Sequence, residues 1–157
     1  MIEIERKFLV STMDFQNLAR SKAYIKQGYL SKDPHRTVRV RIKDEQAFLT
    51  IKGISSESGM SRFEWEKEIS LEEGKTLLQL SLPTIIEKTR YIIPHGEYNF
   101  EVDVFEGDHK GLILAEIELT SEKTKIELPH WIGKEVTGNK LYYNSYLSSS
   151  KESKNSL

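Results

Sequence analysis

The sequence predicts a mainly antiparallel α+β protein, a closed barrel of eight strands with a charged lumen and a few helices packed outside. Several short segments alternate charged and apolar residues with the period of two that is typical of strands. About eight such segments outnumber the candidate helices. The charged faces recur from strand to strand and their signs sort by strand, and a small closed barrel would gather them in one lumen.

Length and composition limit the classes of protein to consider. The chain has 157 residues, which fits one domain, and a net charge of −1 gives no global field to attract nucleic acid or an anionic membrane. It has no cysteine, so disulfides, thiolate ligands and cysteine nucleophiles are excluded. No apolar run is long enough for a signal peptide or a transmembrane helix. We expect a cytoplasmic protein with neither nucleic acid nor membrane as a partner.

The first predicted strand, residues 2–9, sets the pattern. Glu3, Glu5 and Lys7 share one face, and Phe8 lies on the other. Taken alone, this segment is most simply a half-solvated antiparallel strand. Two carboxylates and a cation at this interval are also suited to holding a hard divalent cation beside an anion. Repetition of the pattern along the chain favours the second interpretation.

A helix and a strand follow. The helix is predicted over residues 14–21, with Phe15 and Leu18 as its buried side. The strand over residues 23–30 is indicated by its aromatic and β-branched residues.

The next hairpin presents only cations on its polar face. Arg39 and Arg41 alternate with valines over residues 37–43, and the returning strand over 47–52 adds Lys52. A row of like charges repels itself in a free sheet. This hairpin is therefore suited to a polyanion lying across it.

Carboxylates return in the strands of the second half. The strand over residues 61–70 places Arg62, Glu64 and Glu66 on one face. The remaining in-phase charges are Lys88 and Arg90 over residues 86–93, Glu101 and Asp103 over 98–105, and Glu116 and Glu118 over 112–119.

Three further segments have helical signals. Ser70 and Glu73 form a capping box that opens a helix over residues 71–80, which we expect to pack outside the sheet. Two more helices are predicted at about 120–127 and 138–147.

The domain is predicted to span residues 1–147. Residues 148–157 are rich in serine and lysine and predict a disordered tail.

A lumen lined by so many charged side chains must contain groups that solvate or neutralise them. Burying so many charges without water would cost on the order of several kcal/mol each, so the lumen must hold water, metal and a multiply charged ligand. Carboxylates suit Mg²⁺ or Mn²⁺, whereas zinc is less suited without cysteine or a histidine cluster. Arginine and lysine match phosphate oxygens. A condensed phosphate chain is the predicted ligand.

The charged motifs also follow one another in a characteristic order: Glu3-x-Glu5-x-Lys7, Arg39-x-Arg41, Thr50-Ile51-Lys52, Arg62-x-Glu64-x-Glu66, Lys88-x-Arg90, Glu101-x-Asp103 and Glu116-x-Glu118. In this order they resemble the signature of the CYTH superfamily, also called triphosphate tunnel metalloenzymes. A lone Glu-x-Glu-x-Lys would be weak evidence, whereas the ordered set over residues 1–147 is specific.

The resemblance implies a β-tunnel that binds a small-molecule triphosphate with two divalent ions, Mg²⁺ or Mn²⁺. The implied metal-binding residues are Glu3, Glu5, Glu116 and Glu118. The implied phosphate cradle is Lys7, Arg39, Arg41, Lys52, Arg62, Lys88 and Arg90, with Lys140 at the tunnel mouth. The implied catalytic set is Glu66 and Asp103, which would hold the attacking or metal-bound water, together with Lys88 and Arg90.

The implied reaction is in-line attack of a metal-activated water on a terminal phosphorus, with inorganic triphosphate as the first candidate substrate. The superfamily also includes adenylate cyclases and thiamine or nucleoside triphosphatases. We rank these second because Trp65 falls on an apolar face and Trp131 resembles a core anchor, so no base-reading pocket is evident. A non-catalytic module that binds polyphosphate or nucleotide is a further alternative. A homodimer is compatible with the sequence.

Overall fold

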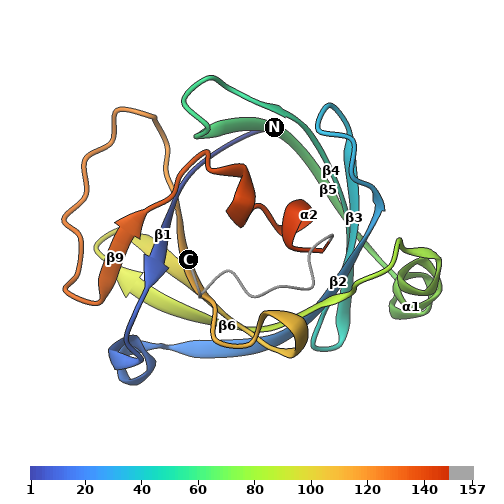
Figure 1. Cartoon of the computed structure of the whole chain (residues 1–157), viewed down its shortest axis with the longest axis horizontal. Coiled ribbons are helices and arrows are strands. Elements are labelled where there is room, and N and C mark those ends of the chain that lie inside the picture. Colours follow the sequence, from blue (N-terminus) through green and yellow to red (C-terminus); the bar gives the residue numbers. More distant parts are fainter. Residues whose placement is uncertain (149–157) are drawn as a thin grey trace.

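The computed structural model describes residues 1–148 and forms a closed antiparallel barrel (Figure 1). The strands are β1 Ile2–Val10, β2 Ser21–Ser31, β3 Thr37–Lys43, β4 Gln46–Ser55, β5 Ser61–Ile69, β6 Ile86–His95, β7 Tyr98–Phe105, β8 Ile113–Glu118 and β9 Ile132–Glu135. Their order is β5-β4-β3-β2-β6-β7-β8-β1-β9, and an additional β5–β1 pairing closes the first eight into a barrel. The predicted closed eight-stranded barrel is confirmed. Apart from Ser148, the predicted tail lies outside the described residues.

Strand β1 closes the barrel because successive parts of it have different partners. Residues 2–4 pair with residues 61–63 of β5, and residues 5–9 pair with residues 114–118 of β8. The Glu3-x-Glu5-x-Lys7 motif therefore lies along the seam of the barrel.

Apolar side chains cover the outer face of β1, β7 and β8. Phe8 and Phe100 pack there with Phe15 and Trp131, all nearly inaccessible to solvent. The rings of Phe15 and Trp131 lie 5.8 Å apart, and those of Phe100 and Trp131 lie 5.3 Å apart. This cluster confirms Trp131 as a core anchor and leaves the opposite face of these strands to the charged residues.

A second apolar cluster lies at one end of the lumen. Phe105 and Leu114 contribute to it from the barrel, and Tyr142 and Leu147 from the C-terminal segment. Figure 1 shows α2, Asn144–Leu147, inside the ring of strands. The C-terminal segment thus closes this end of the barrel.

Helix α1, Leu71–Leu80, has the predicted bounds and lies outside the barrel (Figure 1). The capping box is formed: the Ser70 hydroxyl accepts from the Glu73 N–H, and the Glu73 carboxylate accepts from the Ser70 N–H, both at 3.1 Å. Gly74 is buried against Ala47 of β4, so closely that a Cβ at Gly74 would collide with it.

Two helix predictions near the ends of the barrel differ from the structure. The predicted helix at 14–21 is a single 3₁₀ turn, Asp14–Leu18, in which Phe15 is buried and Leu18 is 55% exposed. 3₁₀ helices usually occur in such short pieces, and of these two side chains only Phe15 packs into the outer apolar cluster. The predicted ten-residue helix at 138–147 is two pieces, a 3₁₀ turn at Lys140–Tyr142 and the short α2, because Tyr143 between them is extended.

The helix predicted at 120–127 is wrong. This stretch has no helix, and Ile126 packs against the outer apolar cluster. An isolated helix of eight residues is marginal without an apolar face to bury. The chain instead continues to β9, which was not predicted.

None of the helices in residues 1–148 has the length and apolar character needed to cross a bilayer.

Candidate functional site

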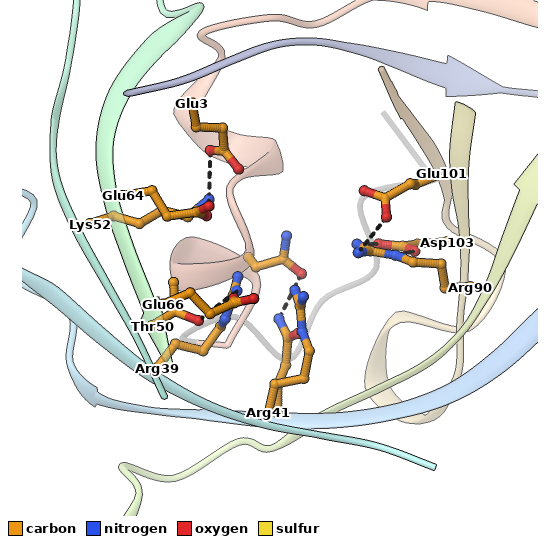
Figure 2. Close-up of polar contacts among 12 residues, drawn as sticks. Glu3, Arg39, Arg41, Thr50, Lys52, Glu64, Glu66, Arg90, Glu101 and Asp103 are labelled. Atoms are coloured by element: carbon orange, nitrogen blue, oxygen red, sulfur yellow. Dashed lines mark hydrogen bonds and ion pairs between the residues drawn. The ribbon is translucent and has the colours of Figure 1, made fainter. Parts of the chain in front are cut away.

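A charged cavity of about 190 Å³ occupies the lumen. Its carboxylates are Glu3, Glu5, Glu64, Glu66, Glu101, Glu116 and Glu118. Its cations are Lys7, Arg39, Arg41, Lys52, Arg62 and Arg90. Figure 2 shows labelled members of this set reaching into the lumen from opposite walls. The period-two alternation of the strands is what brings them to one space.

Carboxylates lie opposite one another at the seam and in the adjoining β7–β8 pair. Glu5 lies directly opposite Glu118, and Glu116 directly opposite Glu101, in the sheet register. Burial, followed by the charges of Glu116 and Glu3, raises the pKa of Glu5 well above its usual value. Like charges in such positions destabilise a sheet unless a cation or a proton lies between them.

Glu116 stays ionised in this group. Burial acts to raise its pKa, but the Lys7 ammonium and a hydrogen bond from the Glu5 carboxyl outweigh burial and hold the pKa well below its usual value. Glu5 therefore holds a proton to a higher pH than Glu116 does.

Lys52 bridges two other carboxylates. Its Nζ lies 2.8 Å from Glu3 Oε1 and 3.4 Å from Glu64 Oε2 (Figure 2). Burial acts to raise the pKa of Glu3, but Lys52 holds that pKa below its usual value. Burial and the nearby charge of Glu3 raise the pKa of Glu64.

The carboxylate oxygens at the seam are suitable ligands for a divalent cation. Carboxylate oxygens are the ligands that Mg²⁺ and Mn²⁺ prefer, and within residues 1–148 neither Glu5 nor Glu118 forms an ion pair. Among residues 1–148, however, no three acidic or histidine side chains are already arranged as a metal site. Lys52 holds Glu3 in an ion pair. Lys52 contacts only Oε1 of Glu3, so the second oxygen of that carboxylate is the one available to a metal ion.

The opposite wall carries cations with few counter-ions. Arg39 Nη2 donates to Thr50 Oγ1 at 3.2 Å and lies 3.7 Å from Glu66 Oε2, while its buried Nε has no hydrogen-bond partner among the described residues. Burial, followed by the charges of Arg39 and Arg90, lowers the pKa of Arg41 to about 9. Crowded, partly unpaired guanidinium groups favour an anion.

Lys88, Arg90 and Asp103 form a buried group at the base of this wall. Arg90 donates to both oxygens of Asp103, at 2.7 and 2.9 Å, and Lys88 Nζ lies 2.7 Å from Asp103. Arg90 and Lys88 outweigh burial and lower the pKa of Asp103 to about 2, whereas burial lowers the pKa of Lys88 to about 7. Arg90 lines the cavity, but Lys88 and Asp103 do not.

A second cavity, of about 480 Å³, adjoins the first at the mouth of the lumen and shares Arg62 and Tyr143 with it. The guanidinium of Arg62 lies 5.7 Å from the centre of the Tyr143 ring. Ile54, Tyr146 and Lys140 line this second cavity alone. Lys140 is thus at the mouth but not among the residues around the charged cavity.

Uncharged residues complete the wall of the charged cavity and were not predicted: Tyr29, Thr37, Ser55, Tyr143 and Asn144. The alternation of strand residues could have identified Tyr29 as lumen-facing, because Tyr29 lies directly opposite Arg39 in the β2–β3 pair. The positions of Tyr143 and Asn144 in the cavity wall could not be predicted in this way, because their segment was predicted as one continuous helix.

Comparisons with known proteins agree with this geometry. A family model described as the CYTH domain matches residues 1–153. The chain is 43% identical over 146 residues to a protein from Acetivibrio thermocellus named inorganic triphosphatase, covering 92% of both chains. It is 38% identical over 154 residues to a protein of the same name from Nitrosomonas europaea, covering 94% of this chain and 97% of the other.

Solved structures share the fold. The crystal structure of the inorganic triphosphatase NE1496 aligns with a TM-score of 0.67 at 35% identity, covering 94% of this chain and 95% of that one. The PH1012 protein from Pyrococcus horikoshii OT3 aligns with a TM-score of 0.63 at 21% identity, covering 76% and 79%. At that identity the second likeness concerns the fold alone.

Proposed function

The chain belongs to the CYTH domain family, and from this membership we propose that it is a divalent-metal-dependent hydrolase that converts inorganic triphosphate to pyrophosphate and phosphate. One observation carries the proposal: a single cavity has the facing carboxylates Glu5 and Glu118 on one wall and guanidinium groups on another, where Arg39 Nε has no hydrogen-bond partner among the described residues. A metal-bound polyphosphate is the ligand class that would complement both walls.

The proposed metal ligands are Glu3, Glu5, Glu116 and Glu118, and the proposed metals are two Mg²⁺ or Mn²⁺ ions. A bound divalent ion supplies Lewis-acid charge and lowers the pKa of a coordinated water. The like-charge pairs of the seam and the hardness of carboxylate oxygen support this assignment.

The proposed phosphate ligands are Lys7, Arg39, Arg41, Lys52, Arg62 and Arg90, which all line the cavity. They would neutralise the phosphate chain and stabilise the charge that moves to the leaving group. Lys140 is proposed to act only at the mouth, because it lines the second cavity.

The proposed water-holding residue is Glu66. Its side chain is 37% exposed, and its carboxylate accepts from Thr50 at 2.7 Å, so it can reach a water in the lumen while held in place. Asp103 is 1% exposed and is occupied by Arg90 and Lys88. For Asp103 we therefore propose a positioning role, holding those two cations, in place of the water-holding role that the sequence resemblance implied.

Phosphate release from inorganic triphosphate, ATP and thiamine triphosphate tests the proposal when measured with Mg²⁺, with Mn²⁺ and with excess chelator. Fast, chelator-sensitive release from inorganic triphosphate is expected, because the lining of the charged cavity offers groups suited to phosphate and metal. Cyclic AMP and pyrophosphate from ATP would instead identify a cyclase. Absence of turnover with all three substrates would contradict the proposal and favour the non-catalytic binding module.

An organic triphosphate is a second candidate because of the cavity at the mouth. Ile54, Tyr143 and Tyr146 give it an apolar lining beside the phosphate site, the feature that the sequence did not reveal. If a base or thiazole ring binds there, Ile54→Ala should lower turnover of ATP or thiamine triphosphate several-fold and leave inorganic triphosphate unaffected. Equal effects on all three substrates would argue against a ring site.

A further inference from the structure

Gln27 of β2 is a fully buried amide beside the phosphate site. It lies directly opposite Arg41 of β3 in the sheet, and its Oε1 accepts from Arg41 Nε at 3.1 Å. Its Nε2 donates to Asn144 Oδ1 at 3.0 Å. The two contacts fix the direction of the amide, because a flipped amide would place donor against donor and acceptor against acceptor.

Asn144 joins the C-terminal segment to the barrel wall. It is the first residue of α2 and lines the charged cavity. Its Oδ1 accepts from Lys88 Nζ at 2.9 Å as well as from Gln27. One oxygen atom therefore holds both an amide from β2 and an ammonium from β6.

Beyond Lys88 the contacts continue through Asp103 to Arg90. The complete series is Arg41, Gln27, Asn144, Lys88, Asp103 and Arg90. It begins and ends at a guanidinium that lines the cavity. One continuous set of buried and partly buried contacts thus links two proposed phosphate ligands.

An amide suits the position of Gln27 because it orients a guanidinium without neutralising it. Within residues 1–148 Arg41 has no carboxylate at ion-pair distance. Gln27 uses only the Nε of Arg41, so the terminal nitrogens of that guanidinium keep their capacity to donate to an anion. A carboxylate at position 27 would pair with Arg41 and cancel the charge.

We infer that Gln27 and Asn144 are positioning residues. They hold Arg41 directly, and Arg90 through Lys88 and Asp103, in place for phosphate binding, and they couple the seating of the C-terminal segment to the phosphate site. The inference rests on the proposed function, because it takes phosphate as the ligand of Arg41. Neither residue acts on the reacting atoms.

The first test is Gln27→Met, which keeps the length of the side chain and removes both hydrogen bonds. Binding of inorganic triphosphate is measured by calorimetry in excess EDTA, where no turnover interferes. Roughly tenfold weaker binding than wild type is expected, the usual effect of losing a hydrogen bond to a charged group. Gln79→Met, on the exposed surface of α1, is the matched control and should bind like wild type. Wild-type binding by a folded Gln27→Met would overturn the inference.

A double-variant comparison shows whether Gln27 acts through Arg41. Arg41→Lys keeps a cation but has no Nε–H for Gln27 to accept. Adding Gln27→Met to Arg41→Lys should then weaken triphosphate binding by less than twofold. A second full tenfold loss would mean that Gln27 acts independently of Arg41, contrary to the inference.

Asn144→Ala tests the link to the C-terminal segment. It should weaken triphosphate binding by about as much as Gln27→Met, and the double variant should be no weaker than the poorer single variant, because both belong to one set of contacts. Binding as tight as wild type in Asn144→Ala would contradict the coupling.

Failure of the inference and failure of the proposed function give different results. If wild type does not hydrolyse inorganic triphosphate, the proposed function is wrong, and the positioning role is then judged from the Arg41 Nε–H resonance in ¹⁵N NMR. Slow exchange of that proton in wild type and fast exchange in Gln27→Met would support the role. Equal exchange in the two proteins would overturn it.

Discussion

Asp103 shows how a single side chain organises the charges around it. It is buried, and its carboxylate contacts both Arg90 and Lys88. Those cations outweigh burial and lower its pKa from 3.8 to about 2. Because the folded pKa is the lower one, the unfolded chain binds more protons between these values, and the stabilisation is present above about pH 4 and lost as the pH falls towards 2.

Asp103→Asn should remove this pH dependence. A shift from 3.8 to about 2 corresponds to about 2 kcal/mol of unfolding free energy. The wild-type free energy of unfolding, measured by urea titration, should therefore fall between pH 4 and pH 2 by about 2 kcal/mol more than that of Asp103→Asn. If the variant does not fold, wild-type urea titrations over the same pH range test the expectation, and a flat profile contradicts it.

Among the elements, α1 combines a strong local signal with no part in the site. The Ser70–Glu73 capping box fixes its first turn, and Gly74 allows close contact with Ala47 of β4. Both features lie outside the barrel, on the face opposite the charged residues. Substitutions in α1 should therefore change the stability of the protein without changing its activity.

Ser70→Ala should lower the free energy of unfolding by about 1 kcal/mol, because the helix loses its cap. Turnover of inorganic triphosphate should stay at the wild-type level. Ser70→Asp, which retains a capping oxygen, should recover most of the stability in the same denaturation experiment. A loss of turnover in a stably folded Ser70→Ala would show that α1 influences the lumen.

Across the whole molecule, the parts that the sequence predicted are those set by local alternation. Strand phase gathered Glu3, Glu5, Glu116 and Glu118 on the inner face because a one-residue shift would have exposed the apolar core. Depth within the lumen could not be predicted in this way. Lys88 and Arg90 have the same phase, yet only Arg90 lines the cavity.

Long-range contacts account for the remaining differences. The C-terminal segment divides into two short turns because Tyr142 and Leu147 bury themselves in the end of the barrel. Strand β9 forms because β1 extends beyond its pairing with β5, which leaves one edge of its last residues for β9. Gln27 was overlooked because its amide has meaning only beside Arg41 and Asn144, which come from distant parts of the chain.

The most direct test of the whole account compares turnover and binding in Glu5→Gln. Glu5 lies in the seam opposite Glu118, so the amide should weaken metal binding and lower metal-dependent hydrolysis of inorganic triphosphate by at least about 100-fold. Binding of triphosphate in excess EDTA, which depends on the cationic wall, should change by less than about twofold. Glu72→Gln, on the exposed surface of α1, should match wild type in both measurements. Hydrolysis by Glu5→Gln at the wild-type rate would contradict the assignment of the seam as the metal site.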